Sequence, residues 1–142
     1  MSATGATSSG EGFTFQVNGG VAAGSAARRA LVAGDGDLPP AVREDVLLLL
    51  TELVSNAVRH AGVGPDQSVR VALQRSPRQV RVEVADPGTD STQVRTNPSG
   101  DELGGWGLVL VEHIAARWGV GQDASGKCVW FEIDFGTGSL PL

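Results

Sequence analysis

The sequence predicts an α/β protein of the α+β sandwich type, in which helices cover one face of a mixed, mostly antiparallel sheet. Two observations lead to this fold class. Residues 69–74 and 80–84 alternate apolar and polar side chains on either side of a predicted turn at residues 76–78. This pattern is typical of antiparallel strands that are buried on one face only. Residues 41–61 carry apolar side chains at helical spacing and are followed by glycines, which predicts a long amphipathic helix over the sheet.

Further elements flank this central unit. Residues 13–17 alternate in the same way and predict a short strand, whereas residues 21–32 are rich in Ala and Arg and predict a helix. A third helix is expected over residues 107–118, because its apolar residues fall on one helical face. Residues 129–135 alternate again and predict the last strand.

Length and composition indicate a single globular domain. The chain has 142 residues, of which 41% are hydrophobic and 19% are charged, as in ordinary folded domains. We expect a disordered tail at residues 1–10, which are small and polar, one domain at residues 11–136, and a C-terminal tail at residues 137–142. Residues 89–103 show no period and are expected to form a lid or a disordered loop.

The charge and the cysteine content restrict the partners and the location. The net charge of -5 argues against a general nucleic-acid binder or a protein of anionic membranes. No apolar stretch approaches the ~20 residues of a membrane span. The N-terminus lacks the regions of a signal peptide, and the lone cysteine cannot form an internal disulfide, so a cytoplasmic location is expected. No His and Cys cluster has zinc-site spacing, so any metal would be a hard cation brought by a substrate.

The predicted helix at residues 41–61 has an unusual polar face. Glu52, Asn56 and Arg59 share one narrow face, and His60 lies at its edge. The opposite arc is apolar and carries Val46, Leu50, Leu53, Ala57 and Ala61. A carboxylate, an amide and a guanidinium on one face could serve a metal-bound anion. Amphipathic helices also commonly carry such residues on a solvated face, and the spacing alone favours that second explanation.

Two other segments carry groups that could bind a ligand. Gly104, Gly105 and Gly107 precede a predicted helix, where backbone N–H groups can approach an anion. No Gly-Lys-Ser/Thr follows them, so they are not a P-loop. Asp86 ends a predicted strand just before Pro87. It could accept a hydrogen bond from an exocyclic amine, although its position alone favours a turn-capping role.

Taken in order, these segments resemble the boxes of the histidine-kinase-like ATPases, the GHKL superfamily. The matching segments are residues 51–60, 105–111, 118–120 and 126–132. The resemblance covers residues 13–135, and it is closest to small stand-alone bacterial members that are related to anti-sigma-factor serine kinases. It implies an ATP-binding sandwich of the Bergerat type.

The resemblance implies a role for each matched residue. Glu52 would be the general base that activates a protein hydroxyl or water, and Asn56 would coordinate the Mg²⁺ that bridges the ATP phosphates. Asp86 would accept the adenine amino group. Cys128 stands where the family usually has a Thr whose hydroxyl binds a water beside that Asp. The nucleotide-binding residues would be Asn56, Asp86, Gly88, Gly104, Gly105, Gly107, Leu108 and Cys128.

Three functions are compatible with this resemblance. The first is an anti-sigma factor that is also a serine/threonine kinase acting on an anti-sigma antagonist, and Glu52 favours it. The second is a nucleotide-gated protein-binding module with little or no turnover. It is favoured by departures from the family pattern at Asp90, Trp106 and Cys128. The third, the catalytic domain of a histidine kinase, is disfavoured because no helical segment with a phosphoacceptor His precedes the boxes. The expected partners are a sigma factor and the antagonist, and the sequence leaves open whether a homodimer forms.

Overall fold

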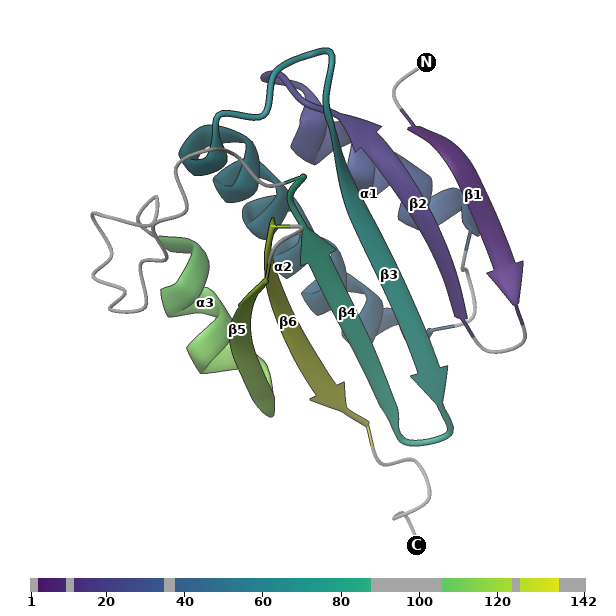
Figure 1. The fold of residues 1–142 in the computed structure, drawn as a ribbon. Coiled ribbons are helices and arrows are strands. Elements are labelled where there is room, and N and C mark those ends of the chain that lie inside the picture. Colours follow the sequence, from purple (N-terminus) through teal and green to yellow (C-terminus); the bar gives the residue numbers. More distant parts are fainter. Residues whose placement is uncertain (1–2, 10–11, 35–37, 88–105, 124–125, 136–142) are drawn as a thin grey trace, which may run out of the picture.

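The computed structural model describes residues 3–9, 12–34, 38–87, 106–123 and 126–135. They form one sheet and a layer of helices (Figure 1). The strands are β1 (Ala3–Ser9), β2 (Gly12–Asn18), β3 (Ser68–Ser76), β4 (Gln79–Ala85), β5 (Arg117–Asp123) and β6 (Gly126–Asp134). The helices are α1 (Ala23–Gly34), α2 (Pro40–Ala61) and α3 (Trp106–Ile114). None of the described helices has the length and apolar character that a membrane span needs.

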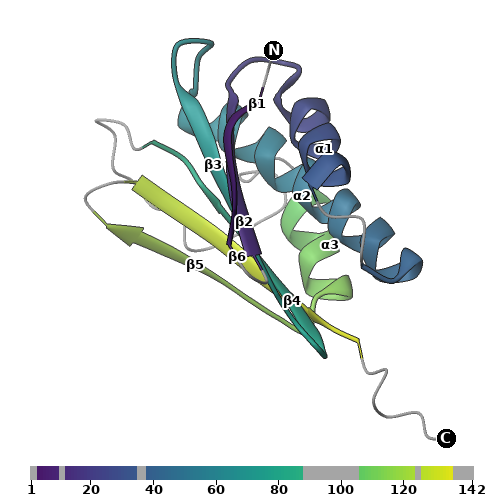
Figure 2. The ribbon, with the colours of Figure 1, turned by 90° about the vertical axis from the view of Figure 1, so that its right-hand side faces the viewer.

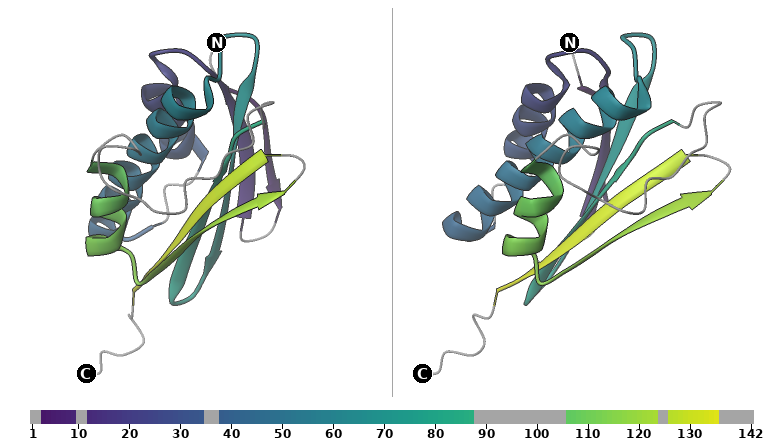
Figure 3. Two further views of the ribbon diagram at one scale, coloured as in Figure 1. Left: turned by 60° about the vertical axis from the view of Figure 1, so that its left-hand side comes forward. Right: turned by 90° about the vertical axis from the view of Figure 1, so that its left-hand side faces the viewer.

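The sheet has six strands in the order β1-β2-β3-β4-β6-β5. The helices lie on one of its faces (Figure 2), and α2 packs against both α1 and α3 (Figure 3). The predicted α+β class, with an antiparallel sheet and helices on one face, is therefore confirmed. Every strand pair among the described residues is antiparallel, so the sheet is not mixed there. For β2 and β3 the reason is that α1 and α2 together return the chain to the end of the sheet that it left, so that Asn18 pairs with Ser68.

The core lies between the sheet and the helices. Strand alternation delivers one row of buried side chains from each inner strand, as predicted. The buried strand residues include Phe13, Phe15, Val17, Val69, Val71, Leu73, Val80, Val82, Val84, Phe131 and Ile133. The buried residues of α2 are Val46, Leu47, Leu49, Leu50, Leu53 and Val54. The predicted inner side of α2 is thus confirmed, and Ala57 packs against the same core at its edge.

Both ends of α2 have a local cause. Pro40 occupies the first turn after Pro39, where a missing N–H costs no helical hydrogen bond. Gly62 adopts the left-handed conformation with φ 68° and ψ 36°, and its N–H donates to the carbonyl of Val58. The N–H of Val63 donates to the same carbonyl at 3.1 Å. The glycine stop that the sequence predicts is therefore a left-handed C-terminal cap.

The N-terminal residues differ from the prediction. Residues 1–10 were expected to be a disordered tail, but Ala3–Ser9 form β1 and pair with β2. Strand pairing uses backbone groups, so the edge of β2 can recruit a segment that lacks the apolar alternation by which strands are recognised. Small polar residues such as Thr and Ser fit this edge position.

The segment around Trp118 also differs from the prediction. The helix expected over residues 107–118 ends at Ile114, and Arg117–Asp123 form the edge strand β5. Helical spacing misled the prediction because Trp118 faces the same core as α3, but from a strand opposite Phe131. Gly119 has a packing reason to lack a side chain, since an added Cβ would lie 2.8 Å from the ring of Trp130.

The other face of the sheet, which carries no helix, holds a paired charge cluster that we call the open-face cluster. Glu132 accepts from Arg117 at 2.6 Å and from Arg81 at 2.9 Å. Arg81 also pairs with Glu83 at 2.9 Å and lies 4.2 Å from the ring centroid of Trp130. These residues alternate with the buried ones along β4 and β6, so their charges stay near solvent while they pair with one another.

Gly19 provides a test of how tightly the α2–β3 connection packs on β2. A Cβ on Gly19 would lie 2.3 Å from the carbonyl oxygen of Val63 and 2.5 Å from that of Gly64. Because backbone atoms cannot rotate away, we predict that Gly19→Ala lowers the free energy of unfolding by about 1–3 kcal/mol in chemical denaturation. The matched control is Gly64→Ala, whose added Cβ meets nothing within 4 Å. Equal losses in the two variants would contradict this packing.

Glu132 provides a test of the open-face cluster. The Arg117 guanidinium, together with Arg81, holds the pKa of the Glu132 carboxyl below its ordinary value, although partial burial opposes them. A carboxyl group with a lowered folded-state pKa stabilises the fold above its unfolded pKa, and this contribution is lost as the pH falls through the folded-state value. We predict that Glu132→Gln costs about 1 kcal/mol at neutral pH.

The cost of Glu132→Gln should shrink as the pH falls below about 4.3, the ordinary value for Glu. Thermal or urea unfolding across this pH range measures the effect. Glu112→Gln, which alters an exposed carboxylate on α3, serves as the control and should leave the pH dependence of stability unchanged. A pH-independent cost of Glu132→Gln would show that the charge of Glu132 contributes nothing.

Candidate functional site

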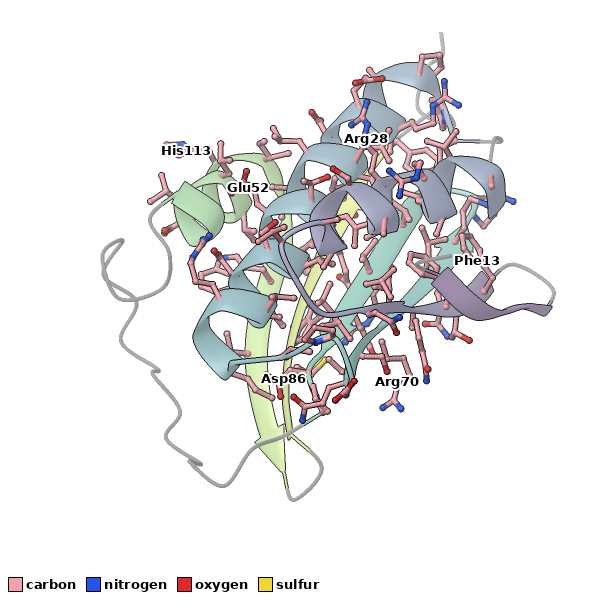
Figure 4. The ribbon with its side chains drawn as sticks, turned by 90° about the horizontal axis from the view of Figure 1, so that it is seen from above. Phe13, Arg28, Glu52, Arg70, Asp86 and His113 are labelled. Carbon is pink, nitrogen blue, oxygen red and sulfur yellow. The ribbon has the colours of Figure 1, made fainter. Side chains whose placement is uncertain are left out.

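The site begins with the polar flank of α2. Burial of Leu50, Leu53 and Val54 against the sheet fixes the rotation of the helix about its axis. Glu52 and Asn56 are half-buried, so neither points fully into solvent. Figure 4 shows Glu52 on the side of α2 that faces α3. Asn56 follows one turn later on the same flank.

The opposite flank of α2 faces α1. A Cβ on Gly24 of α1 would lie 2.6 Å from the hydroxyl of Ser55 and 3.2 Å from the methyl group of Thr51. The Thr51 hydroxyl donates to the carbonyl of Leu47 at 2.7 Å. Each of these two residues immediately precedes a member of the Glu52–Asn56 pair, about 100° around the helix. Close packing on α1 therefore leaves Glu52 and Asn56 on the flank away from α1.

The two predicted catalytic-site side chains differ in their partners. The Asn56 amide oxygen accepts a hydrogen bond from the Arg59 guanidinium at 2.8 Å. The Glu52 carboxylate makes no hydrogen bond or ion pair in the part of the chain that the structure describes. A half-buried carboxylate that has no partner among the described residues could take a proton from a ligand. The Asn56 oxygen keeps a second lone pair for a cation.

Asp86 lies at the end of β4 and is buried. Among the described residues, Asp86 is the only charged residue that is buried, with 7% exposure. Its backbone N–H donates to the carbonyl of Lys127 at 3.0 Å, and the N–H of Lys127 donates to the Asp86 carboxylate at 3.2 Å. The carboxylate therefore extends the β4–β6 ladder beyond its last residue pair. A carboxylate has about four lone-pair sites, so the bond from Lys127 alone does not use all of them.

The register of β6 places Cys128 differently from the prediction. Cys128 pairs with Ala85, and the two residues of an antiparallel pair project from the same face. Ala85 and Asp86 are consecutive, so their side chains project from opposite faces. Cys128 therefore belongs to the open face, together with Trp130, and Lys127 is the residue that shares the face of Asp86. The register therefore places Lys127, and not Cys128, directly opposite Asp86.

The parts of the site gather at one end of the molecule. Figure 1 shows the last turns of α2, the end of β4, the start of β6 and the start of α3 at the same end of the sandwich. Gly107 and Leu108 lie in the first turn of α3, where backbone N–H groups lack helical partners. Gly88, Gly104, Gly105 and the expected lid at residues 89–103 lie outside the described residues.

The donor set fits a nucleotide that brings its own cation. Asn56 offers an amide oxygen, which suits a hard cation such as Mg²⁺. Among the described residues, no group of three or more His, Cys, Asp or Glu side chains could hold a metal by itself. A cation bound at Asn56 would therefore need most of its ligands from phosphate oxygens and water, as Mg²⁺ in nucleotide sites does.

Lys127 is a neighbour of Asp86 that the sequence analysis did not single out. The signal was present, because Val129, Phe131 and Ile133 mark the inner face of β6. Counting two residues back from Val129 gives Lys127 and not Cys128. The family resemblance had instead matched Cys128 to the position of the usual Thr.

The family comparison agrees with this geometry. Residues 21–133 match the family model described as a histidine kinase-like ATPase domain. This range contains Glu52, Asn56, Asp86 and Lys127. The comparison with curated proteins gave no match. Because the family model covers well over half of the chain, the protein belongs to the histidine kinase-like ATPase domain family.

Proposed function

We propose that this protein is an ATP-binding anti-sigma factor and an Mg²⁺-dependent serine/threonine kinase that phosphorylates an anti-sigma antagonist. The observation that carries the proposal is the Glu52 carboxylate. It is half-buried, has no partner among the described residues and precedes Asn56 by one helical turn. A kinase needs a group that accepts the proton of the attacking hydroxyl, and Glu52 is suited to this role.

The described residues divide the work of phosphoryl transfer. Asp86 would accept the amino group of adenine and so position the nucleotide at the strand ends. Asn56 would contribute its amide oxygen to the Mg²⁺ that neutralises the phosphates. Arg59 holds that oxygen in place through its hydrogen bond. Glu52 would accept the proton from the hydroxyl of a Ser or Thr on the antagonist. The hydroxyl oxygen would then bond to the γ-phosphorus while ADP leaves.

A second candidate is a nucleotide-gated binding module with little or no turnover. The hydrogen bond from Arg59 to the Asn56 oxygen favours it, because this contact occupies one lone pair of the proposed cation ligand. In this candidate ATP changes the affinity for the partner and no phosphate is transferred. In both candidates the protein partner is proposed to be a sigma factor or an anti-sigma antagonist.

Replacing Glu52 separates the two candidates. Glu52→Gln keeps the size and polarity of the side chain and removes the base. If the protein is a kinase, we predict that transfer of labelled phosphate from ATP to the antagonist falls about 10²–10⁴-fold. Calorimetry should show ATP–Mg²⁺ affinity within about twofold of the parent. The control is Glu44→Gln, an exposed carboxylate on the same helix, which should leave transfer unchanged.

Two results would contradict the kinase proposal. The first is equal transfer by Glu52→Gln and the parent. The second is the absence of transfer to any antagonist candidate while partner affinity still depends on ATP, which would establish the second candidate. Asn56→Ala distinguishes cation binding from base chemistry, because it should lose transfer and Mg²⁺-dependent ATP affinity together.

Replacing Asp86 tests adenine recognition. A carboxylate accepts from the adenine amino group, whereas guanine places a carbonyl oxygen at that position and would set two acceptors against each other. We therefore predict that the parent binds ATP more tightly than GTP in calorimetry. Asp86→Asn should weaken ATP binding by about 1–3 kcal/mol. Asp66→Asn, in an exposed turn, is the control. Equal affinities for ATP and GTP would contradict the assignment.

A further inference from the structure

We propose that Lys127 is a base-reading residue whose ammonium group donates a hydrogen bond to a ring nitrogen of adenine, next to the amino group that Asp86 accepts. The proposal rests on the proposed nucleotide binding and names a second recognition residue for that site. It replaces Cys128, which the register removes from the face of Asp86.

The position of Lys127 follows from the end of the β4–β6 ladder. Two hydrogen bonds join Lys127 to Asp86, one between their backbones and one from the Lys127 N–H to the carboxylate. These bonds make the two residues direct neighbours across the strands. Lys127 also shares a face with Val129 and Phe131, which pack into the core. Its aliphatic stem therefore begins on the helix-covered side of the sheet.

The surroundings of Lys127 leave its ammonium group available to a ligand. Lys127 is half-buried, and a lysine in this position can bury its stem while the ammonium reaches a polar group. No ion pair or hydrogen bond of that ammonium occurs within the described parts of the chain. Although Asp86 is its neighbour, no salt bridge joins the two side chains there. The Lys127 ammonium group is therefore not paired with the carboxylate of its neighbour Asp86.

An acceptor beside a donor is the pattern that adenine requires. The adenine amino group is a donor, and a ring-nitrogen acceptor flanks it on either side, N1 on one edge and N7 on the other. Asp86 and Lys127 offer the complementary acceptor and donor, whichever edge faces them. In the same orientation, guanine presents a carbonyl oxygen in place of the amino group, and at N1 a donor in place of the acceptor. If the N1 edge faces the pair, Lys127 therefore adds a second point of discrimination against guanine, whereas at the N7 edge both bases present an acceptor.

The test compares Lys127→Met with Cys128→Ser. Methionine keeps an unbranched stem and removes the donor, whereas the Cys128 change lies on the open face. Calorimetric titrations would use ATP, adenosine, and the 1-deaza and 7-deaza analogues of ATP. We expect Lys127→Met to weaken the binding of ATP and of adenosine by the same factor, about 5–20-fold. The affinities of Cys128→Ser should stay within about twofold of the parent's. Thermal unfolding without ligand checks that each variant is folded.

The deaza analogues identify the atom that is read. For the parent, one of the two analogues should bind about 5–20-fold more weakly than ATP, and Lys127→Met should not weaken that analogue further. Unchanged ATP affinity in Lys127→Met would overturn the proposal. A loss for ATP without a loss for adenosine would also overturn it, because the ammonium would then contact the phosphates. A parent that binds neither ATP nor adenosine would instead overturn the proposed function itself.

Discussion

The packing of α2 against the sheet is the constraint on which the rest of the site depends. Six aliphatic side chains of this helix are buried, and full burial of each contributes about 1.5–3 kcal/mol. A single hydrogen bond contributes only about 0.5–1.5 kcal/mol. The apolar stripe therefore decides how α2 is rotated, and the polar residues take the positions that remain. Glu52 and Asn56 point where they do because Leu50, Leu53 and Val54 point into the core.

The second half of the site comes from the sheet. Asp86 is buried at the end of β4, and a buried carboxylate is tolerated only when it is hydrogen-bonded. The Lys127 N–H supplies one such bond from the neighbouring strand. The same pairing determines which residue of β6 stands next to the carboxylate. One register thus places both a negative and a positive side chain at the strand ends, on the face that α2 covers.

Much of this arrangement is readable from the sequence, and the exceptions have physical causes. The alternation of β3 and β4 and the periodicity of α2 reflect burial on one face, so both elements and their inner residues were predicted. β1 was missed because its pairing with β2 depends on backbone groups and not on apolar side chains. β5 was missed because Trp118 packs against the same core as α3, and contact with the core alone cannot distinguish a strand from a helix.

The sequence predicts the position of a site residue only where the geometry of its own helix or strand determines that position. Glu52 and Asn56 were placed on one face by helical geometry alone. Which residue of β6 lies opposite Asp86 depends on the register between β4 and β6, two strands that are far apart in the chain. Local sequence patterns do not determine that register. The family resemblance matched Cys128 to the usual Thr, whereas strand alternation from Val129 places Lys127 on the face of Asp86.

The β4–β6 pairing has a consequence for the integrity of the chain. Seven residue pairs join Gln79–Ala85 to Cys128–Asp134, so this ladder links the described residues up to 87 to those from 106 onward. A cut between those points would leave both strands of the ladder intact, one on each fragment. The two pieces, expressed separately, could then reassociate through the pairing of β4 with β6. Asp86 would lie on one piece and Lys127 on the other. Fragment complementation would report the contact between Asp86 and Lys127 directly, because neither piece alone contains both residues.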